Sequence, residues 1–178
     1  MPAPRPFALE RYFARHEFSA RYLLGSSDPE ALTVSELLAL DPEQAERLPG
    51  LGLGYTEPAG DPELRRQIAR LYETVAEDRI LVFSGSEEPI YAFFQVALDP
   101  GDHVIVHTPA YASHLEIPRA LGANVEPWPA DPTRGWALDP EDLRRRLRTD
   151  TKVILVSVPH NPTGFLPDGD AWQEILNI

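Results

Sequence analysis

The segment Asn161-Pro162-Thr163-Gly164 comes directly after an apolar run, residues 153–159, and a single histidine. A continuous run of this kind predicts a buried strand of a parallel sheet. The Asn-Pro-Thr-Gly sequence predicts a turn at the carboxyl end of that strand, where open α/β sheets bind their ligands. The amide of Asn161 offers a donor and an acceptor to a bound ring or carboxylate. An ordinary turn explains an isolated motif equally well, so its meaning depends on the rest of the chain.

A second candidate is the small-residue turn Ser84-Gly85-Ser86-Glu87, which lies between a predicted strand and a predicted helix. Backbone N–H groups at a helix N-terminus bind phosphate, and glycine lets the backbone approach the anion closely. The turn is neither a P-loop nor a G-x-G-x-x-G fingerprint. We expect the backbone amides and the Ser86 hydroxyl to bind a phosphate, with the carboxylates of Glu87 and Glu88 turned away. A plain strand-to-helix turn is the alternative.

Two tyrosines complete the set of candidates. Tyr111 follows the next predicted strand in Thr108-Pro109-Ala110-Tyr111, where its ring can stack on a flat cofactor. Tyr55 lies on a glycine-bounded loop, from which it can reach away from its own domain. The alternatives are a core tyrosine at a helix start for Tyr111 and a packed surface loop for Tyr55.

Alternating strands and helices must position these residues. The sequence predicts strands at residues 80–83, 104–107, 125–128 and 153–158, with 125–128 at a sheet edge. It predicts helices at residues 7–22, 33–40, 61–72, 87–98, 113–121, 139–147 and from 168 onward. Strands that alternate with helices indicate βαβ units. We therefore predict an α/β fold of three α/β/α layers around a mainly parallel sheet, with an N-terminal helical arm.

Composition narrows the class of protein. The 178 residues include 43% apolar residues, enough for a packed core, and carry a net charge of −12. This acidity argues against nucleic acid or an anionic membrane as a partner, because both require a basic face. Cysteine is absent, which excludes disulfides and thiolate metal sites. The N-terminus lacks the apolar core of a signal peptide, so a cytoplasmic location is expected.

The candidates in their order along the chain resemble the N-terminal part of a class I/II aminotransferase, a pyridoxal-phosphate enzyme of the aspartate-aminotransferase fold. The matching segments are a Y-x-x-x-x-G-x-x-x-L-R stretch at residues 55–65, a G-[AS]-x-[EQ] turn at 85–88, a P-G-D turn at 100–102, a P-x-[YF] turn at 109–111 and N-P-T-G at 161–164. The resemblance runs from about Gly25 to the last residue. It implies an incomplete large cofactor-binding domain at residues 49–178, preceded by an arm and part of a small domain at 1–48.

The resemblance also assigns roles. The cofactor it implies is pyridoxal 5'-phosphate, bound by phosphate contacts at the glycine turn, a stacking tyrosine and an asparagine at the ring's phenolic oxygen. The residues implied for the cofactor are Gly85, Ser86, Glu87, Tyr111, Asn161 and, toward a partner subunit, Tyr55. Those implied for the substrate are Gly25, Ser26 and Asn161. The partner contact implies a homodimer, and the substrates implied are an amino acid and a 2-oxo acid in amino-acid metabolism or biosynthesis.

The family's catalytic groups have no counterpart in the sequence. Its Schiff-base lysine, the aspartate at the pyridine nitrogen and two arginines lie beyond Ile178, where the chain stops as if cut within a helix. Lys152 is the only lysine, and it begins a predicted buried strand, so it is no substitute. We therefore assign no catalytic residue and expect the chain alone to be inactive. The Leu-Gly-Ser-Ser-Asp-Pro segment and His160 resemble a capreomycidine-synthase-like branch that acts on arginine derivatives.

Other functions fit the pattern less well. A lyase, decarboxylase or oxidase of the same fold shares these residues. A non-catalytic domain that binds phosphate or a nucleotide at Gly85 is the main alternative outside enzymes. His107, His114 and His160 have no metal-ligand spacing, and Ser157 lacks a G-x-S-x-G elbow. The glycines of residues 50–54 do not follow a strand, so they are not a dinucleotide fingerprint.

Overall fold

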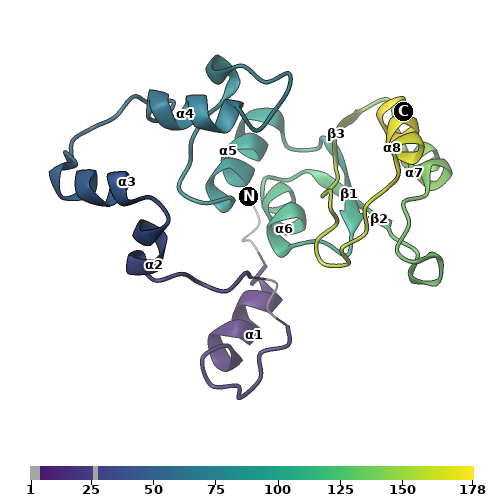
Figure 1. The fold of residues 1–178 in the computed structure, drawn as a ribbon. Helices are drawn as coiled ribbons and strands as arrows, with labels where there is room; N and C mark the ends of the chain where they lie inside the picture. The colour runs from purple at the N-terminus through teal and green to yellow at the C-terminus, as the bar shows by residue number, and fades with distance from the viewer. Residues whose placement is uncertain (1–4, 26–27) are drawn as a thin grey trace. The chain divides into compact units, whose positions relative to one another are not determined.

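The computed structural model describes residues 5–25 and 28–178 (Figure 1). They form two compact units, of which one, the sheet unit, contains residues 5–24 and Gly85–Ile178. The other, the helical unit, lies within Gly25–Ser84. The predicted division into residues 1–48 and 49–178 concerns a complete enzyme and stays a prediction.

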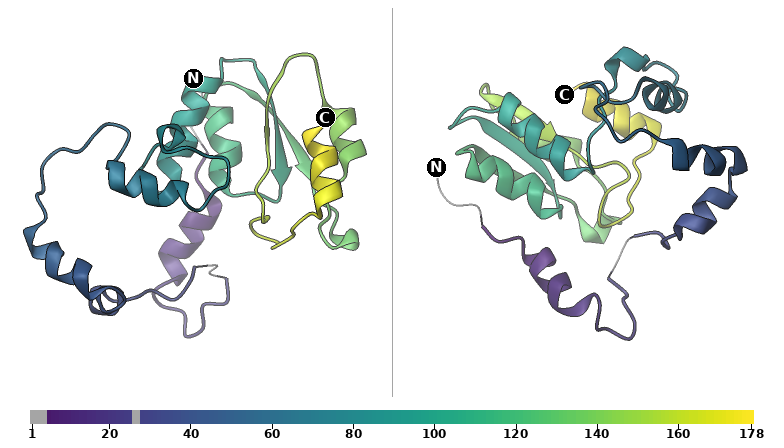
Figure 2. Two further views of the ribbon diagram at one scale, coloured as in Figure 1. Left: turned by 45° about the horizontal axis from the view of Figure 1, so that its top comes forward. Right: turned by 90° about the vertical axis from the view of Figure 1, so that its left-hand side faces the viewer.

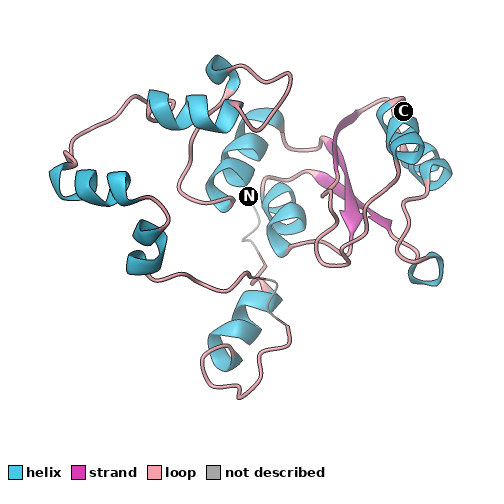
Figure 3. Cartoon of the chain, in the orientation of Figure 1, coloured by secondary structure: helices cyan, strands magenta, loops and turns pink. Residues whose placement is uncertain are grey.

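Three parallel strands make the sheet of the sheet unit (Figure 3). They are β1 (His103–Thr108), β2 (Asn124–Pro129) and β3 (Thr151–Leu155), in the order β2-β1-β3. His103 of β1 pairs with Asn124 on one side and Thr151 on the other. The central strand is buried almost throughout, as expected for a parallel strand covered on both faces. The predicted parallel sheet with β2 at an edge is confirmed.

Helices cover both faces of this sheet (Figure 2). Val104 and Val106 of β1 pack into an apolar cluster with α5 (Glu87–Ala97) and α6 (Ala112–Ala120). Ile105 points the other way, toward α7 (Pro140–Arg146) and α8 (Gly169–Leu176). Successive side chains of a strand alternate between faces, so one apolar strand serves both cores. The predicted three-layer α/β/α fold is confirmed.

Local sequence signals fix several element ends in the sheet unit. Asp139 accepts a hydrogen bond from the Asp142 N–H (3.0 Å) and begins α7, and Asp168 caps α8 in the same way. The turn before β1 holds Gly101 at φ +97°, which glycine adopts without strain. A short 3₁₀ helix, η3 (Pro132–Arg134), follows β2, and α1 (Ala8–His16) is shorter than the predicted helix at residues 7–22.

The helical unit consists of α2 (Val34–Ala39), α3 (Pro42–Arg47), η1 (Leu48–Gly50), α4 (Pro62–Ala69) and η2 (Glu77–Arg79). Thr33 and Glu36 form a capping box at α2, and Asp61 caps α4. Helix α3 was not predicted, although Asp41 and Pro42 give it the same start signal as α4. None of the helices in the described ranges is long and apolar enough to cross a membrane.

Two strand predictions are wrong. Residues 80–83 form no strand; within the described chain, Val82 N–H donates to Ala59 O (3.0 Å), but no regular ladder of such bonds follows. β3 ends at Leu155 and alternates between half-buried and exposed residues, so it is not the continuously buried strand predicted at 153–158. An apolar run becomes a strand only where a second strand pairs with it. In the described chain β3 has a neighbouring strand on one side only, which is β1.

Candidate cofactor site

The predicted phosphate turn lies at the N-terminus of α5. Gly85 has φ +83° and no atom near the position of a Cβ, so it opens the turn to a ligand. Ser86 is the N-cap residue, but its side chain makes no capping hydrogen bond. Among the described residues, no acceptor receives the N–H groups of Ser86 and Glu87. Unpaired N–H groups at a helix start are the donors that an anion requires.

The Glu87 side chain is held by α6. The hydroxyl of Ser113, which is fully buried, donates to Glu87 Oε1 (3.1 Å). Burial lowers the pKa of the nearby His114, and the charge of Glu87 partly opposes this. The first turns of α5 and α6 are therefore joined beside the phosphate turn, with the carboxylate engaged by a buried hydroxyl.

Tyr111 lies immediately before α6, at the end of the turn that follows β1. Its hydroxyl donates to the carboxylate of Glu10, and its ring meets Phe7 edge-on at a centroid distance of 6.5 Å. The hydrogen bond to Glu10 is the main cause that raises the pKa of Tyr111 to about 12. The N-terminal segment thus contacts the residue predicted to stack on the cofactor, a contact that the sequence analysis missed.

Asn161 lies in a turn beyond the carboxyl end of β3, and its side chain is exposed. His160, just before it, is buried and hydrogen-bonded through both ring nitrogens, one of them to Pro109 O (2.8 Å). Pro109 belongs to the turn that carries Tyr111. The structure therefore brings the Asn161 turn and the Tyr111 turn together at the carboxyl edge of the sheet, as the sequence predicts for parallel strands.

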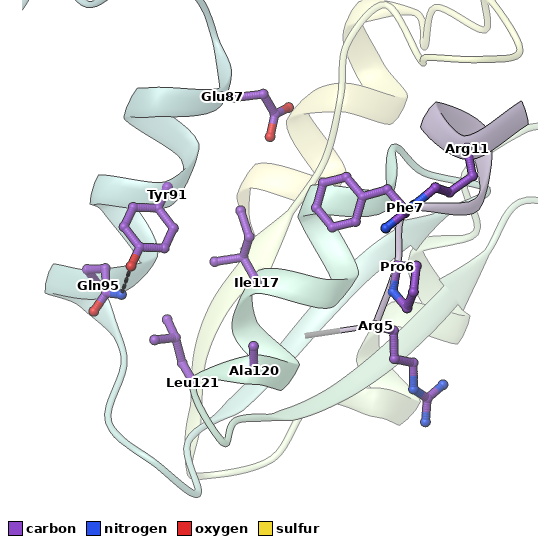
Figure 4. Close-up of a pocket in the computed structure, with 10 residues that line it drawn as sticks. All are labelled: Arg5, Pro6, Phe7, Arg11, Glu87, Tyr91, Gln95, Ile117, Ala120 and Leu121. Atoms are coloured by element: carbon purple, nitrogen blue, oxygen red, sulfur yellow. Dashed lines mark hydrogen bonds between the residues drawn. The ribbon is translucent and has the colours of Figure 1, made fainter. Parts of the chain in front are cut away.

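A groove of about 770 Å³ runs between α5, α6 and the N-terminal segment (Figure 4). Its walls include Phe7, Tyr91, Ile117 and Leu121, and Glu87 lies at its rim. Tyr111 and Asn161 do not line it. The groove therefore shares one residue with the candidate site but is not centred on it.

Three other predicted positions belong to none of these turns. Tyr55 and Gly25 belong to the helical unit, and both are exposed. Ser26 lies outside the described residues. Lys152 is exposed on β3, which corrects the prediction that it begins a buried strand.

His107 is a buried residue whose role the sequence did not reveal. It is 2% exposed, and neither of its ring nitrogens has a hydrogen-bond partner in the described chain. Its ring lies 4.0 Å from that of His160 and 5.3 Å from that of Trp128, centroid to centroid. Burial is the main cause that lowers the pKa of His107 to about 4. Residues 5–25 and 28–178 contain no group of three side chains able to hold a metal ion.

Comparison with known proteins identifies the family. Residues 22–178 match the family model for aminotransferase class I and II. The chain is 34% identical over 172 residues to capreomycidine synthase of Streptomyces vinaceus, which covers 96% of this chain and 44% of that protein. It is 37% identical over 129 residues to an aspartate/prephenate aminotransferase of Thermus thermophilus, covering 70% of this chain and 34% of that enzyme.

A solved structure shows the same fold. A PLP-dependent aminotransferase from Streptococcus suis superposes with a TM-score of 0.90 at 34% identity, over 99% of this chain and 48% of that one. The chain thus spans less than half the length of each of these three proteins. With a family match over most of its length, the chain belongs to the class I and II aminotransferase family.

Proposed function

We propose that the gene product is a pyridoxal-phosphate-dependent aminotransferase, which moves an amino group between an amino acid and a 2-oxo acid. In this proposal the chain supplies the N-terminal part of the cofactor-binding domain. The observation that carries the proposal is the convergence of three turns in the sheet unit. Ser113 links the Glu87 turn to α6, and His160 links the Asn161 turn to Pro109, in a chain that belongs to the family.

The donor set fits the cofactor. Within the described chain, the N–H groups of Ser86 and Glu87 are donors without an acceptor, at the positive end of a helix dipole, which favours a phosphate group. Gly85 has no side chain that could cover them. Tyr111 offers an aromatic ring and Asn161 an amide at the adjacent turns. When bound, the cofactor supplies a conjugated ring that accepts electrons.

Each residue has a distinct task in this proposal. Ser86 and Glu87 bind the phosphate through backbone N–H groups, and Gly85 keeps the approach open. Tyr111 stacks on the ring and so fixes its plane, while Asn161 orients the ring through its oxygen and contacts the substrate carboxylate. Lys152, the only lysine of these 178 residues, is exposed on β3, and in this proposal it does not act as the lysine that the family uses. The chain by itself therefore binds without catalysing.

The substrate class and assembly follow from the same proposal. Capreomycidine synthase is among the relatives, and we propose an amino acid of the arginine type as substrate, in a biosynthetic reaction. Tyr55 is exposed on the helical unit, and we propose that it reaches the cofactor phosphate of a second subunit in a homodimer, with Gly25 and Ser26 over the substrate. A cytoplasmic location stays a prediction, which cell fractionation would test.

The test uses the polypeptide at the length that its gene encodes, fixed first by intact mass. We expect the wild-type protein to bind pyridoxal phosphate, followed as a change in visible absorbance. Asn161→Ala should weaken binding roughly tenfold, because a polar group at the ring loses its partner. The matched control, Asn177→Ala, removes an exposed amide at the end of α8 and should leave the dissociation constant unchanged. Equal affinity for all three proteins would contradict the assigned site.

The second candidate is a phosphate- or nucleotide-binding domain without aldehyde chemistry. The unpaired N–H groups at the start of α5 favour it as much as they favour the first, because they recognise any phosphate. A competition experiment separates the two, since the second candidate predicts that the protein binds AMP and is indifferent to pyridoxal phosphate. A lyase, decarboxylase or oxidase of the same fold would bind the cofactor equally and would differ in its products.

A further inference from the structure

The ring of His160 bridges two turns. Its Nε2 lies 2.8 Å from the carbonyl oxygen of Pro109, which can only accept, so Nε2 carries the hydrogen and donates. Its Nδ1 lies 2.7 Å from Thr163 Oγ1 and, in the neutral ring, accepts from that hydroxyl. The side chain is 3% exposed, and its burial lowers the pKa of His160, which favours the neutral form. Burial and two directed bonds fix the ring in one orientation.

The main chain of His160 closes the turn that holds Asn161. The His160 N–H donates to Phe165 O (2.8 Å), and the His160 carbonyl accepts from the Gly164 N–H (2.7 Å). Asn161 is the next residue in the chain, so its backbone follows any displacement of His160. The orientation of the Asn161 amide is therefore coupled to the position of the His160 ring.

The other end of this bridge, Pro109, lies close in sequence to Tyr111. Pro109 stands two residues before Tyr111 and 51 residues before His160 in the chain. The two turns leave the neighbouring strands β1 and β3, whose register ends at Val106 and Leu155. Strand pairing does not extend to the turns, so the hydrogen bond from His160 to Pro109 is a side-chain link between them beyond the ladder.

Two aromatic residues, His107 and Trp128, pack next to the His160 ring. His107 lies 4.0 Å from His160 between ring centroids, and Trp128 lies beyond His107. Trp128 is fully buried and donates from Nε1 to Asp139 O (3.2 Å). The His160 ring thus packs against the tilted ring of His107, which in turn contacts Trp128 in the core beside the sheet.

We propose that His160 is a positioning residue, which holds the Asn161 amide at a fixed place relative to the Tyr111 ring by bonding Pro109 and Thr163. This role rests on the proposed function, because it acts through residues assigned to the cofactor. His160 itself touches neither cofactor nor substrate in the proposal. A second-layer group of this kind sets how precisely a binding site is held.

Three variants of the gene product separate this role from simple packing. His160→Phe keeps a ring against His107 but removes both hydrogen bonds. His160→Gln restores an N–H donor near the position of Nε2 and an acceptor beside it. His103→Phe is the matched control, because His103 is also buried and hydrogen-bonded through both ring nitrogens, but at the opposite end of β1.

The measurements are the dissociation constant for pyridoxal phosphate, the visible circular dichroism of the bound form and the melting temperature of the protein without cofactor. We expect His160→Phe to weaken binding roughly tenfold and to reduce the visible signal, because the asparagine is no longer held in place. His160→Gln should recover most of both. His103→Phe should lower the melting temperature and leave the dissociation constant within about twofold of the wild type.

Two outcomes would overturn the role of His160 alone. One is unchanged affinity and signal in His160→Phe, and the other is a loss that tracks melting temperature across all three variants. If His160→Phe fails to fold, Thr163→Val replaces it, since it removes only the hydroxyl at Nδ1 and should still reduce the visible signal. A wild-type protein that binds no pyridoxal phosphate would instead overturn the proposed function, and this role with it.

Discussion

The two ends of β1 each bury a histidine on the same face of the sheet, and the two histidines differ in every other respect. At the amino end, His103 pairs through Nδ1 with the Thr151 hydroxyl (2.8 Å) and through Nε2 with Glu126 (3.1 Å). At the carboxyl end, His107 has no hydrogen-bond partner within the described chain. Four residues along one strand separate a satisfied polar side chain from an unsatisfied one.

The network at the amino end continues beyond His103. Glu126 also accepts from Arg146 (3.1 Å), which donates in addition to Asp142 (2.8 Å) and Pro127 O (2.8 Å). These bonds join β1, β2 and α7. The carboxyl end holds instead the turns of Tyr111 and Asn161. The difference therefore lies in one side chain: in the described chain His103 is hydrogen-bonded at the amino end, whereas His107 has no partner beside a fully bonded His160 at the carboxyl end.

Acidification should give the largest effect, and it acts at the carboxyl end. The pKa of His107 is lowered from 6.5 to about 4, so between these pH values the unfolded chain binds a proton that the folded chain does not. The free energy of unfolding should therefore fall as pH decreases through this window, by about 3 kcal/mol at most. Chemical denaturation of the gene product, repeated at pH values from about 8 to 4, measures this change in the free energy of unfolding.

The control for acidification is His107→Phe, which keeps a ring but cannot titrate. It should flatten the pH dependence, leaving a smaller slope from His160 and His114, whose pKa values are lowered in the same direction. At neutral pH the substitution should change the free energy of unfolding little, since it removes a buried polar group for which the described residues offer no partner. A slope identical to that of the wild type would show that His107 does not carry the effect.

The second-largest effect is expected from removing the hydrogen bonds of His103 at the amino end of β1. His103→Phe should lower the free energy of unfolding by about 2 kcal/mol, because Thr151 and Glu126 each lose a hydrogen bond to a buried ring. Denaturant unfolding at pH 8 measures this cost, and His107→Phe in the same assay is the comparison. If both substitutions lower the free energy of unfolding equally, the difference in hydrogen bonding between the two ends of β1 does not affect stability.

The smallest effect sharpens the description of the carboxyl end. Glu10→Gln removes the carboxylate that accepts the Tyr111 hydroxyl, and the pKa of Tyr111 should fall from about 12 toward its ordinary 10.0. Nuclear magnetic resonance of the tyrosine ring carbons against pH would follow it, with Tyr72 of the helical unit as internal reference. A Tyr111 pKa that stays near 12 would place the cause outside this contact.

Much of the fold could be predicted because its signals are local. Asp61-Pro62 and Asp139-Pro140 each begin a helix where predicted, since a cap needs only its own next three residues. The strand predicted at residues 80–83 from the same kind of local pattern was wrong. Their apolar pattern is that of a strand, but a strand exists only with a neighbour, and the described bonds of Val82 and Ile80 lead to Ala59 and Arg65.

The sequence by itself determined the order of elements, the caps and the family, because periodicity, capping residues and turn motifs are written in consecutive positions. It also placed Gly85, Tyr111 and Asn161 at the ends of elements. Only the tertiary structure decided that His160 bonds Pro109, that Glu10 meets Tyr111, and that His103 is paired while His107 is not. Such contacts join residues far apart in the chain, and their geometry is set by how strands and helices pack rather than by any local pattern.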